Sequence, residues 1–175
     1  MHRWLKPRRE RRCIAMKRMQ FYIDTSVINF LFVTDAPDFR RTTVDFFENH
    51  AGRHDLFISD VVLLEIDRDP NMEHRALLLE AIREYHLELL PDNYRDTVIE
   101  LAALYIERGA IPRNKTEDAQ HVAYATVFEM DALLSWNFKH LANVNREARI
   151  QIVNIEAGYR YPIRLLSPLE AIYEP

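Results

Sequence analysis

The sequence predicts an α/β protein of three layers, α/β/α, in which helices cover both faces of a central, mostly parallel sheet. Short apolar segments alternate along the chain with amphipathic segments of roughly 10–17 residues, as expected for strands joined by helical crossovers. The chain has 175 residues, which is about the length of one domain. Hydrophobic residues make up 48% of it and charged residues 29%, a balance typical of a globular protein rather than a disordered one.

The first half of the chain contains three predicted strands, two of which stop at a polar residue. The apolar run that starts at Gln20 ends at Asp24, and the second strand ends at Ser59, a favourable N-cap for the next helix. Pro91 closes the third strand. In order, the predicted elements are a strand at 20–24 with a helical stretch after it, a helix at 38–50, a strand at 56–58, helices at 60–67 and 72–84, and a strand at 86–90.

The second half contains the most clearly amphipathic helix, which ends with Gly109 at the position where glycine commonly terminates a helix. Thr116 is expected to cap the helix after it. Ser167 and Glu170 have the spacing of a capping box, with Pro168 at the first helical position. The predicted elements are helices at 92–108 and 117–130, a strand at 132–135, a helix at 137–147, a last strand at 150–155 and a short terminal helix from Pro168.

Charge is distributed unevenly along the chain. Residues 1–18 hold eight of the 23 lysines and arginines but only one of the 27 acids, so residues 19–175 carry a net charge of −11. One interpretation of this leader is a disordered arm or an over-extended gene start. The other is an arm that contacts nucleic-acid phosphates or an acidic partner. We therefore divide the chain into a basic N-terminal extension, 1–18, and one domain, 19–175.

Several protein classes are excluded by what the sequence lacks. The three glycines are too few and too scattered to form a P-loop or a dinucleotide-binding turn. No histidine spacing of a zinc protease and no G-x-S-x-G nucleophile is present. Apolar runs such as 61–64 are too short to span a bilayer, residues 1–18 lack the apolar core of a secretory signal, and Cys13 is the lone cysteine. We expect a cytoplasmic protein with no membrane segment.

Two carboxylates occupy positions that favour a functional site. Asp24 ends the first strand, and in parallel sheets ligands bind beyond the carboxyl ends of strands. Its alternative role is a helix N-cap, although Thr25 or Ser26 could cap instead and leave Asp24 free. Glu65 lies in a helical turn that is apolar nearly all round, so it needs a metal or a cationic partner. The alternative for Glu65 is an internal ion pair with an arginine such as Arg68.

A third carboxylate, Asp118, is predicted in the first turn of a helix. Acids there compensate the helix dipole, which is the simplest explanation of Asp118. Glu117 already fills that role, however, and Asp118 lies beside the buried stripe of the helix. We therefore expect Asp118 to face inward. His121 and His140 are interpreted as packed or supporting residues and Trp136 as a structural tryptophan, with base stacking by Trp136 as the alternative.

Taken together, four segments make the sequence resemble the PIN domain, including the VapC-type toxin ribonucleases of bacterial toxin–antitoxin pairs. The order of the segments is more specific than any one of them, and the resemblance covers about residues 19–155. The matching segments are FYIDTSV at 21–27, ISDVVLLEI at 58–66, EDAQHVAYAT at 117–126 and LLSWNFKHL at 133–141.

The resemblance implies a parallel-sheet α/β/α fold and cleavage of RNA with Mg²⁺ or Mn²⁺. By position, Asp24, Glu65 and Asp118 match the catalytic, metal-binding acids, and Ser26 matches the supporting polar residue after the first of them. Many PIN domains have a further acid where this chain has Asn137, which offers a neutral oxygen. One metal ion is therefore expected to bind well and a second more weakly.

The implied partners are an RNA substrate, a small antitoxin and a second copy of the chain. Arg113, Lys115 and Lys139 flank the predicted cleft and could contact the RNA backbone, with ordinary surface charge as the alternative. Two hypotheses follow. The first is a metal-dependent endoribonuclease, and the second is a non-catalytic PIN-like module that binds RNA or protein.

Overall fold

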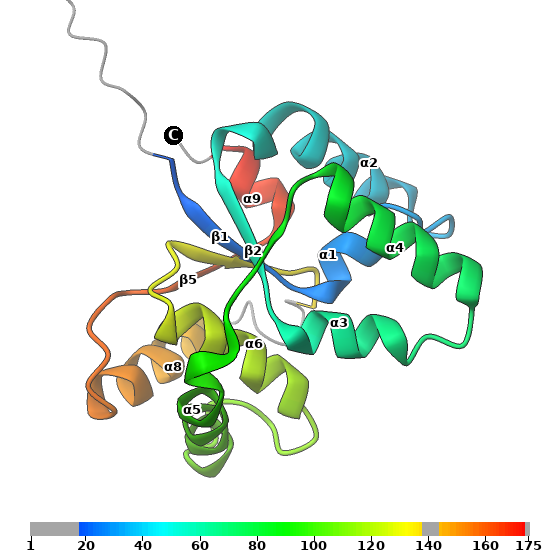
Figure 1. Cartoon of the computed structure of the whole chain (residues 1–175). Helices are drawn as coiled ribbons and strands as arrows, with labels where there is room; N and C mark the ends of the chain where they lie inside the picture. The colour runs from blue at the N-terminus through cyan, green and yellow to red at the C-terminus, as the bar shows by residue number, and fades with distance from the viewer. Residues whose placement is uncertain (1–17, 138–143, 174–175) are drawn as a thin grey trace, which may run out of the picture.

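The computed structural model describes residues 18–137 and 144–173, and within these it contains a five-stranded, all-parallel sheet in the order β3-β2-β1-β4-β5 (Figure 1). The predicted α/β class is confirmed. Most of the basic extension, Cys13, Lys139 and His140 lie outside the described residues. The strands are β1 (Gln20–Ile23), β2 (Asp55–Ile58), β3 (Glu88–Leu89), β4 (Ala132–Leu134) and β5 (Arg164–Leu166).

Helices connect the strands and cover both faces of the sheet. A π-helical turn, η1, extends α2, and short 3₁₀ turns, η2 and η3, precede β2 and α5. Their bounds are α1 (Thr25–Asn29), α2 (Pro37–Asp45), η1 (Phe46–His50), η2 (Ala51–Arg53), α3 (Asp60–Asp67), α4 (Met72–Glu84), η3 (Asp92–Tyr94), α5 (Arg95–Glu107), α6 (Thr116–Val127), α8 (Val144–Glu156) and α9 (Pro168–Ile172).

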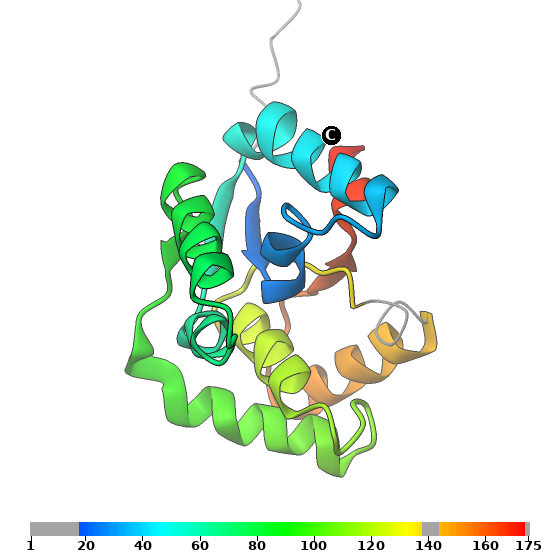
Figure 2. The ribbon, with the colours of Figure 1, turned by 90° about the vertical axis from the view of Figure 1, so that its right-hand side faces the viewer.

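The side chains of β1 show how the sheet separates two cores. Tyr22 packs with α5, α6 and α8 on one face, whereas Phe21 and Ile23 pack with α1, α4 and α9 on the other. Because side chains alternate along a strand, this buried strand supplies both cores and reads as a continuous apolar run. Figure 1 shows α5, α6 and α8 below the sheet and α2, α4 and α9 above it, and Figure 2 shows the same three layers from the side.

The strand order places the end of β1 at a topological switch point. From β1 the chain proceeds outward to β2 and β3, then returns to add β4 on the other side of β1. The connections on one side of β1 run across one face of the sheet, and those on the other side run across the opposite face. A crevice therefore opens at the carboxyl ends of β1 and β4. Helix α3 lies near this point and contributes Val61 to one core and Val62 to the other.

The structure corrects the prediction for the C-terminal region. The predicted strand at 150–155 is the second half of helix α8, and the last strand is instead β5, which the sequence reading missed. Ile150 and Val153 are buried while Ile152 and Ile155 are exposed, which is helical rather than alternating spacing. Part of the predicted helix at 137–147 lies outside the described residues, and the terminal helix has the predicted capping box.

Smaller differences concern caps and lengths. The helix predicted at 38–50 is α2 extended by η1, and the third strand is shorter than predicted. Ser59 occupies the N-cap of α3 but makes no side-chain cap bond, and Thr116 is the first residue of α6 rather than its cap. Gly109 follows α5 with a φ of +68°, the left-handed backbone expected there. Within the described part of the chain, none of the helices has the length and apolar character needed to cross a membrane.

Candidate active site

Asp24 follows β1 directly and caps helix α1. Its Oδ1 accepts hydrogen bonds from the backbone amides of Ser26 (2.8 Å) and Val27 (3.4 Å) and from the Ser26 hydroxyl. Asp24 therefore fills the N-cap role that was the alternative for this residue, and neither Thr25 nor Ser26 caps α1 in its place. The same carboxyl group also lines a cavity, so capping and a functional role are compatible. The cap fixes the orientation of a carboxylate that is only 2% exposed.

Ser26 connects the end of β1 to the segment after β4. Its Oγ accepts a hydrogen bond from the backbone amide of Trp136 (2.8 Å) and lies 3.3 Å from Ser135 Oγ. Ser135 Oγ in turn accepts the backbone amide of Asn137 (2.9 Å). These contacts hold Asn137 beside the same cavity that Asp24 lines, as its position after the fourth strand predicted.

Glu65 reaches the site from α3. Its Oε2 accepts a hydrogen bond from Thr25 Oγ1 and lies 3.1 Å from Nε2 of His121 on α6. The side chain is 27% exposed, so it is half-buried rather than enclosed. Arg68 is not its ion-pair partner, because Arg68 Nη1 lies 2.9 Å from Glu117 Oε1. The partner of Glu65 is instead His121, which was predicted only as a packed or supporting residue.

A buried chain of hydrogen bonds stands behind Glu65. His121 Nδ1 lies 2.8 Å from the hydroxyl of Tyr22, which lies 2.6 Å from Ser59 Oγ. Tyr22 and Ser59 are fully buried, and His121 is nearly so. Because both hydroxyls can rotate, the chain is satisfied whether the imidazole is neutral or protonated. It fixes the ring and, through the ring, the carboxylate of Glu65.

The ionisable groups of the site perturb one another. Burial raises the pKa of Asp24, and the charge of His121, together with hydrogen bonding to Ser135 and Ser26, only partly offsets this. Burial would also raise the pKa of Glu65, but hydrogen bonding to His121 and Thr25 outweighs it and the pKa is lowered. Burial would lower the pKa of His121, but the hydrogen bond to Glu65 and the charge of Asp24 outweigh it, so the pKa is raised. The neighbours of Asp24 thus compensate only part of the desolvation of its carboxylate.

The cavity in front of these residues measures about 320 Å³. Its donors are carboxylate, hydroxyl and amide oxygens, which are the ligands that Mg²⁺ and Mn²⁺ prefer. Two carboxylates share its wall, and the charge of Glu65 raises the pKa of Asp24. The donor chemistry therefore fits one hard divalent cation. The cavity is lined by Asp24, Thr25, Ser26, Asn29, Phe30, Glu65, His121 and Asn137.

Asp118 is close to this group but does not line the cavity. It lies in the first turn of α6, and its side chain is 11% exposed, so the predicted inward position is borne out. Its Oδ2 is 3.7 Å from Lys115 Nζ, and its charge contributes to the raised pKa of His121. Among the residues that the structure describes, no three His, Cys, Asp or Glu side chains are arranged to hold a metal ion. The three acids thus lie in one region without forming a ready-made triad.

The positions of the remaining predicted site residues say less about function. Arg113 is exposed, Lys115 is engaged with Asp118, and Lys139 lies outside the described residues. Trp136 donates from Nε1 to Thr43 Oγ1 (2.8 Å) and packs edge-on against Phe39, which is a structural role. Thr25 was not predicted as a partner of Glu65. A hydroxyl next to the strand-end acid was its only signal.

Comparison of the chain with protein-family models, with curated proteins and with solved structures finds no match. The resemblance to PIN domains rests on the four sequence segments, all of which contribute to this site. Asp24 comes from the first segment, Glu65 from the second, His121 from the third and Asn137 from the fourth.

Proposed function

We propose that this protein is a metal-dependent ribonuclease of the PIN type that hydrolyses RNA phosphodiester bonds with Mg²⁺ or Mn²⁺. The observation that carries the proposal is the pair of carboxylates, Asp24 and Glu65, on one cavity wall at the switch point of a parallel sheet. Carboxylates whose environments push their pKa values in opposite directions, as here, are characteristic of functional sites.

In this proposal Asp24 and Glu65 hold the cation, with Asp118 and Asn137 as outer or additional oxygen donors. When bound, the ion supplies an acidified water and neutralises charge that develops on the phosphate. The protein's own part is orientation. Backbone amides fix Asp24 through its Oδ1, and Thr25 and His121 fix Glu65 through its Oε2. The amide of Asn137 adds no charge, which favours one firmly held ion over two.

A non-catalytic module that binds RNA or protein is the second candidate, and one observation favours it. Glu65 is already bound by Thr25 and His121, and Asp118 lies beside Lys115, so both acids have partners without a metal ion. A binding module predicts RNA retention without turnover, unaffected by substitution of the acids.

The toxin role and its partners belong to the same proposal. A short neighbouring reading frame that encodes a DNA-binding antitoxin would support it, and copurification with that product would test it. A homodimer is likewise proposed from the resemblance, and light scattering of the purified chain measures it. The basic residues 1–18 would reduce the electrostatic repulsion between RNA and the acidic residues 19–175.

RNA cleavage with and without divalent ions separates the two candidates. The purified protein is expected to cleave RNA with Mn²⁺ or Mg²⁺, to lose activity in EDTA, and to lose it on Asp24→Asn or Asp118→Asn. Asp35→Asn, at an exposed loop position, is the matched control and should retain activity. Undiminished cleavage in EDTA would rule out the proposed chemistry, and metal-insensitive binding without cleavage would support the module instead.

A further inference from the structure

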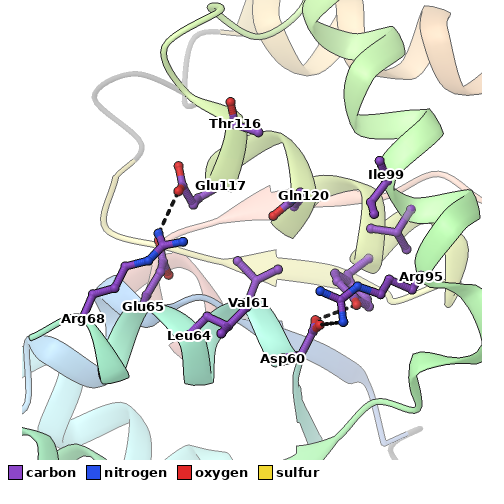
Figure 3. Close-up of a pocket in the computed structure, with 12 residues that line it drawn as sticks. Asp60, Val61, Leu64, Glu65, Arg68, Arg95, Ile99, Thr116, Glu117 and Gln120 are labelled. Atoms are coloured by element: carbon purple, nitrogen blue, oxygen red, sulfur yellow. Dashed lines mark hydrogen bonds and ion pairs between the residues drawn. The ribbon is translucent and has the colours of Figure 1, made fainter.

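A second cavity lies next to the candidate active site and shares Glu65 with it. It measures about 290 Å³ and opens between α3, α5 and α6 (Figure 3). This volume is near the lower end of the range of about 300–1,000 Å³ typical of small-molecule pockets. The common wall at Glu65 means that a chain passing the first cavity can place its neighbouring group in the second.

Two ion pairs flank the second cavity at its ends. At one end Arg68 of α3 pairs with Glu117 of α6 at 2.9 Å. At the other, Arg95 of α5 lies 3.3 Å from Asp60 Oδ2, whose Oδ1 accepts the hydroxyl of Tyr124 (2.6 Å). These links span three helices, so the space between them is built into the fold rather than left by a loop.

The inner surface combines apolar walls with one free amide. Leu64 and Ile99 line the cavity and remain 47% and 46% exposed, and Val61 and Val98 lie deeper. Gln120 extends from α6 between the two ion pairs (Figure 3). Its carboxamide has no hydrogen-bond partner among the residues described. It therefore offers a donor and an acceptor side by side.

We propose that this cavity is a subsite for one unpaired base of the RNA, with its edge read by Gln120. A nucleobase is flat and apolar on its faces and carries donors and acceptors on its edge, which matches apolar walls and a free carboxamide. Proteins read single-stranded RNA by such contacts, stacking bases on side chains or guanidinium planes and bonding their edges. The inference rests on the proposed function for its RNA ligand, and it adds a determinant of cleavage sequence.

The test uses the full chain in EDTA, where no turnover occurs, titrated separately with AMP, GMP, CMP and UMP. Methyl NMR signals of Leu64, Val98 and Ile99 are expected to shift saturably, with one nucleotide bound more tightly than the others. Gln120→Leu should weaken that nucleotide about twofold to tenfold and reduce the discrimination. Ile99→Ala, at an exposed position, should weaken all four nucleotides. Gln20→Leu, at the exposed start of β1, is the matched control.

Ribose 5-phosphate serves as the probe without a base. Equal shifts with ribose 5-phosphate, or no shift of these methyl groups by any nucleotide, would overturn the subsite. RNA cleavage is measured on the same samples with Mn²⁺ added. Cleavage without methyl shifts would refute the proposed subsite but support the proposed nuclease activity. Methyl shifts without cleavage would support the subsite and refute the nuclease activity.

Discussion

At the scale of single residues, Asp24 serves two purposes that oppose each other. Its Oδ1 caps α1, which stabilises the fold, but its burial raises its pKa, so ionisation at neutral pH costs folding free energy. The folded state therefore prefers the protonated acid. The stability that Asp24 contributes is greatest at low pH and is lost as pH rises through its raised pKa.

Asp24→Asn is accordingly expected to stabilise the metal-free protein at neutral pH while abolishing cleavage. Asparagine retains an oxygen that accepts the amides of Ser26 and Val27 but carries no charge. Urea denaturation in EDTA measures the effect. The advantage of the variant should shrink as pH is lowered toward 4, and a variant less stable than wild type at pH 7.5 would contradict this reading.

Tyr22→Phe probes the hydrogen-bond chain behind Glu65. Loss of the hydroxyl leaves Ser59 Oγ and His121 Nδ1 buried without this partner, which is expected to cost about 1–3 kcal/mol in the free energy of unfolding. Tyr85→Phe is the matched control, because the hydroxyl of Tyr85 bonds Glu48 at the surface. Equal losses in both variants would show that the chain adds no particular stability.

The residue scale also shows what the sequence could predict of the site. Asp24 was predictable because it ends a strand, and Glu65 because its helical turn is otherwise apolar. The partner of Glu65 was not, since His121 is distant in sequence and meets it only when α3 and α6 pack. Arg68, the nearer cation in sequence, points to Glu117 instead.

At the scale of elements, α8 shows where sequence patterns mislead. The run Ile-Gln-Ile-Val-Asn-Ile is short and rich in β-branched residues, which favours a strand. Tertiary packing decides otherwise: Ile150, Val153 and Asn154 share one buried helical face. Asn154 accepts the hydroxyl of Tyr105 there, a contact between helices that no local pattern reveals.

The connection between α3 and α4 predicts a pH effect. Asp69 accepts the His74 ring and the backbone amide of Asn71 (2.9 Å), and these hydrogen bonds lower its pKa. Because the pKa of Asp69 is lowered on folding, its carboxylate stabilises the folded state at pH values above its ordinary pKa of 3.8. This stability is lost as the pH falls through the pKa that Asp69 has in the folded state. The stability difference between wild type and Asp69→Asn should therefore narrow from pH 6 to about pH 2.5 in urea titrations.

Asp35→Asn, at an exposed position in the loop before α2, provides the comparison for that titration. It is measured beside Asp69→Asn at each pH. If Asp69→Asn behaves like Asp35→Asn, the carboxylate does not stabilise this connection, and the N-cap that Asn71 provides for α4 is sufficient by itself.

At the scale of the whole molecule, the three-layer parallel fold was predictable and its strand order was not. Alternation of short apolar and longer amphipathic segments predicts parallel strands joined by helices, whatever their order. The order depends on which faces the helices cover, and it is this order that sets β1 beside β4 and brings Asp24 to Asn137. The site is thus a property of topology as much as of motifs.

A cation bound between two elements should stabilise the whole domain. Binding to the native state alone contributes about 2.7 kcal/mol when the free ion is a hundredfold above its Kd. We expect Mn²⁺ to raise the melting temperature of wild type in a concentration-dependent manner, and to have little effect on Asp24→Asn. Equal shifts in both proteins would place the ion elsewhere.

Crystals soaked in MnCl₂ and measured near the manganese absorption edge show whether Asp24 and Glu65 hold a metal ion. One strong anomalous peak is expected in the 320 Å³ cavity, within coordination distance of carboxylate oxygens of Asp24 and Glu65, and a weaker one at most near Asn137. An empty cavity in soaked crystals, with manganese bound only at other sites, would contradict this expectation.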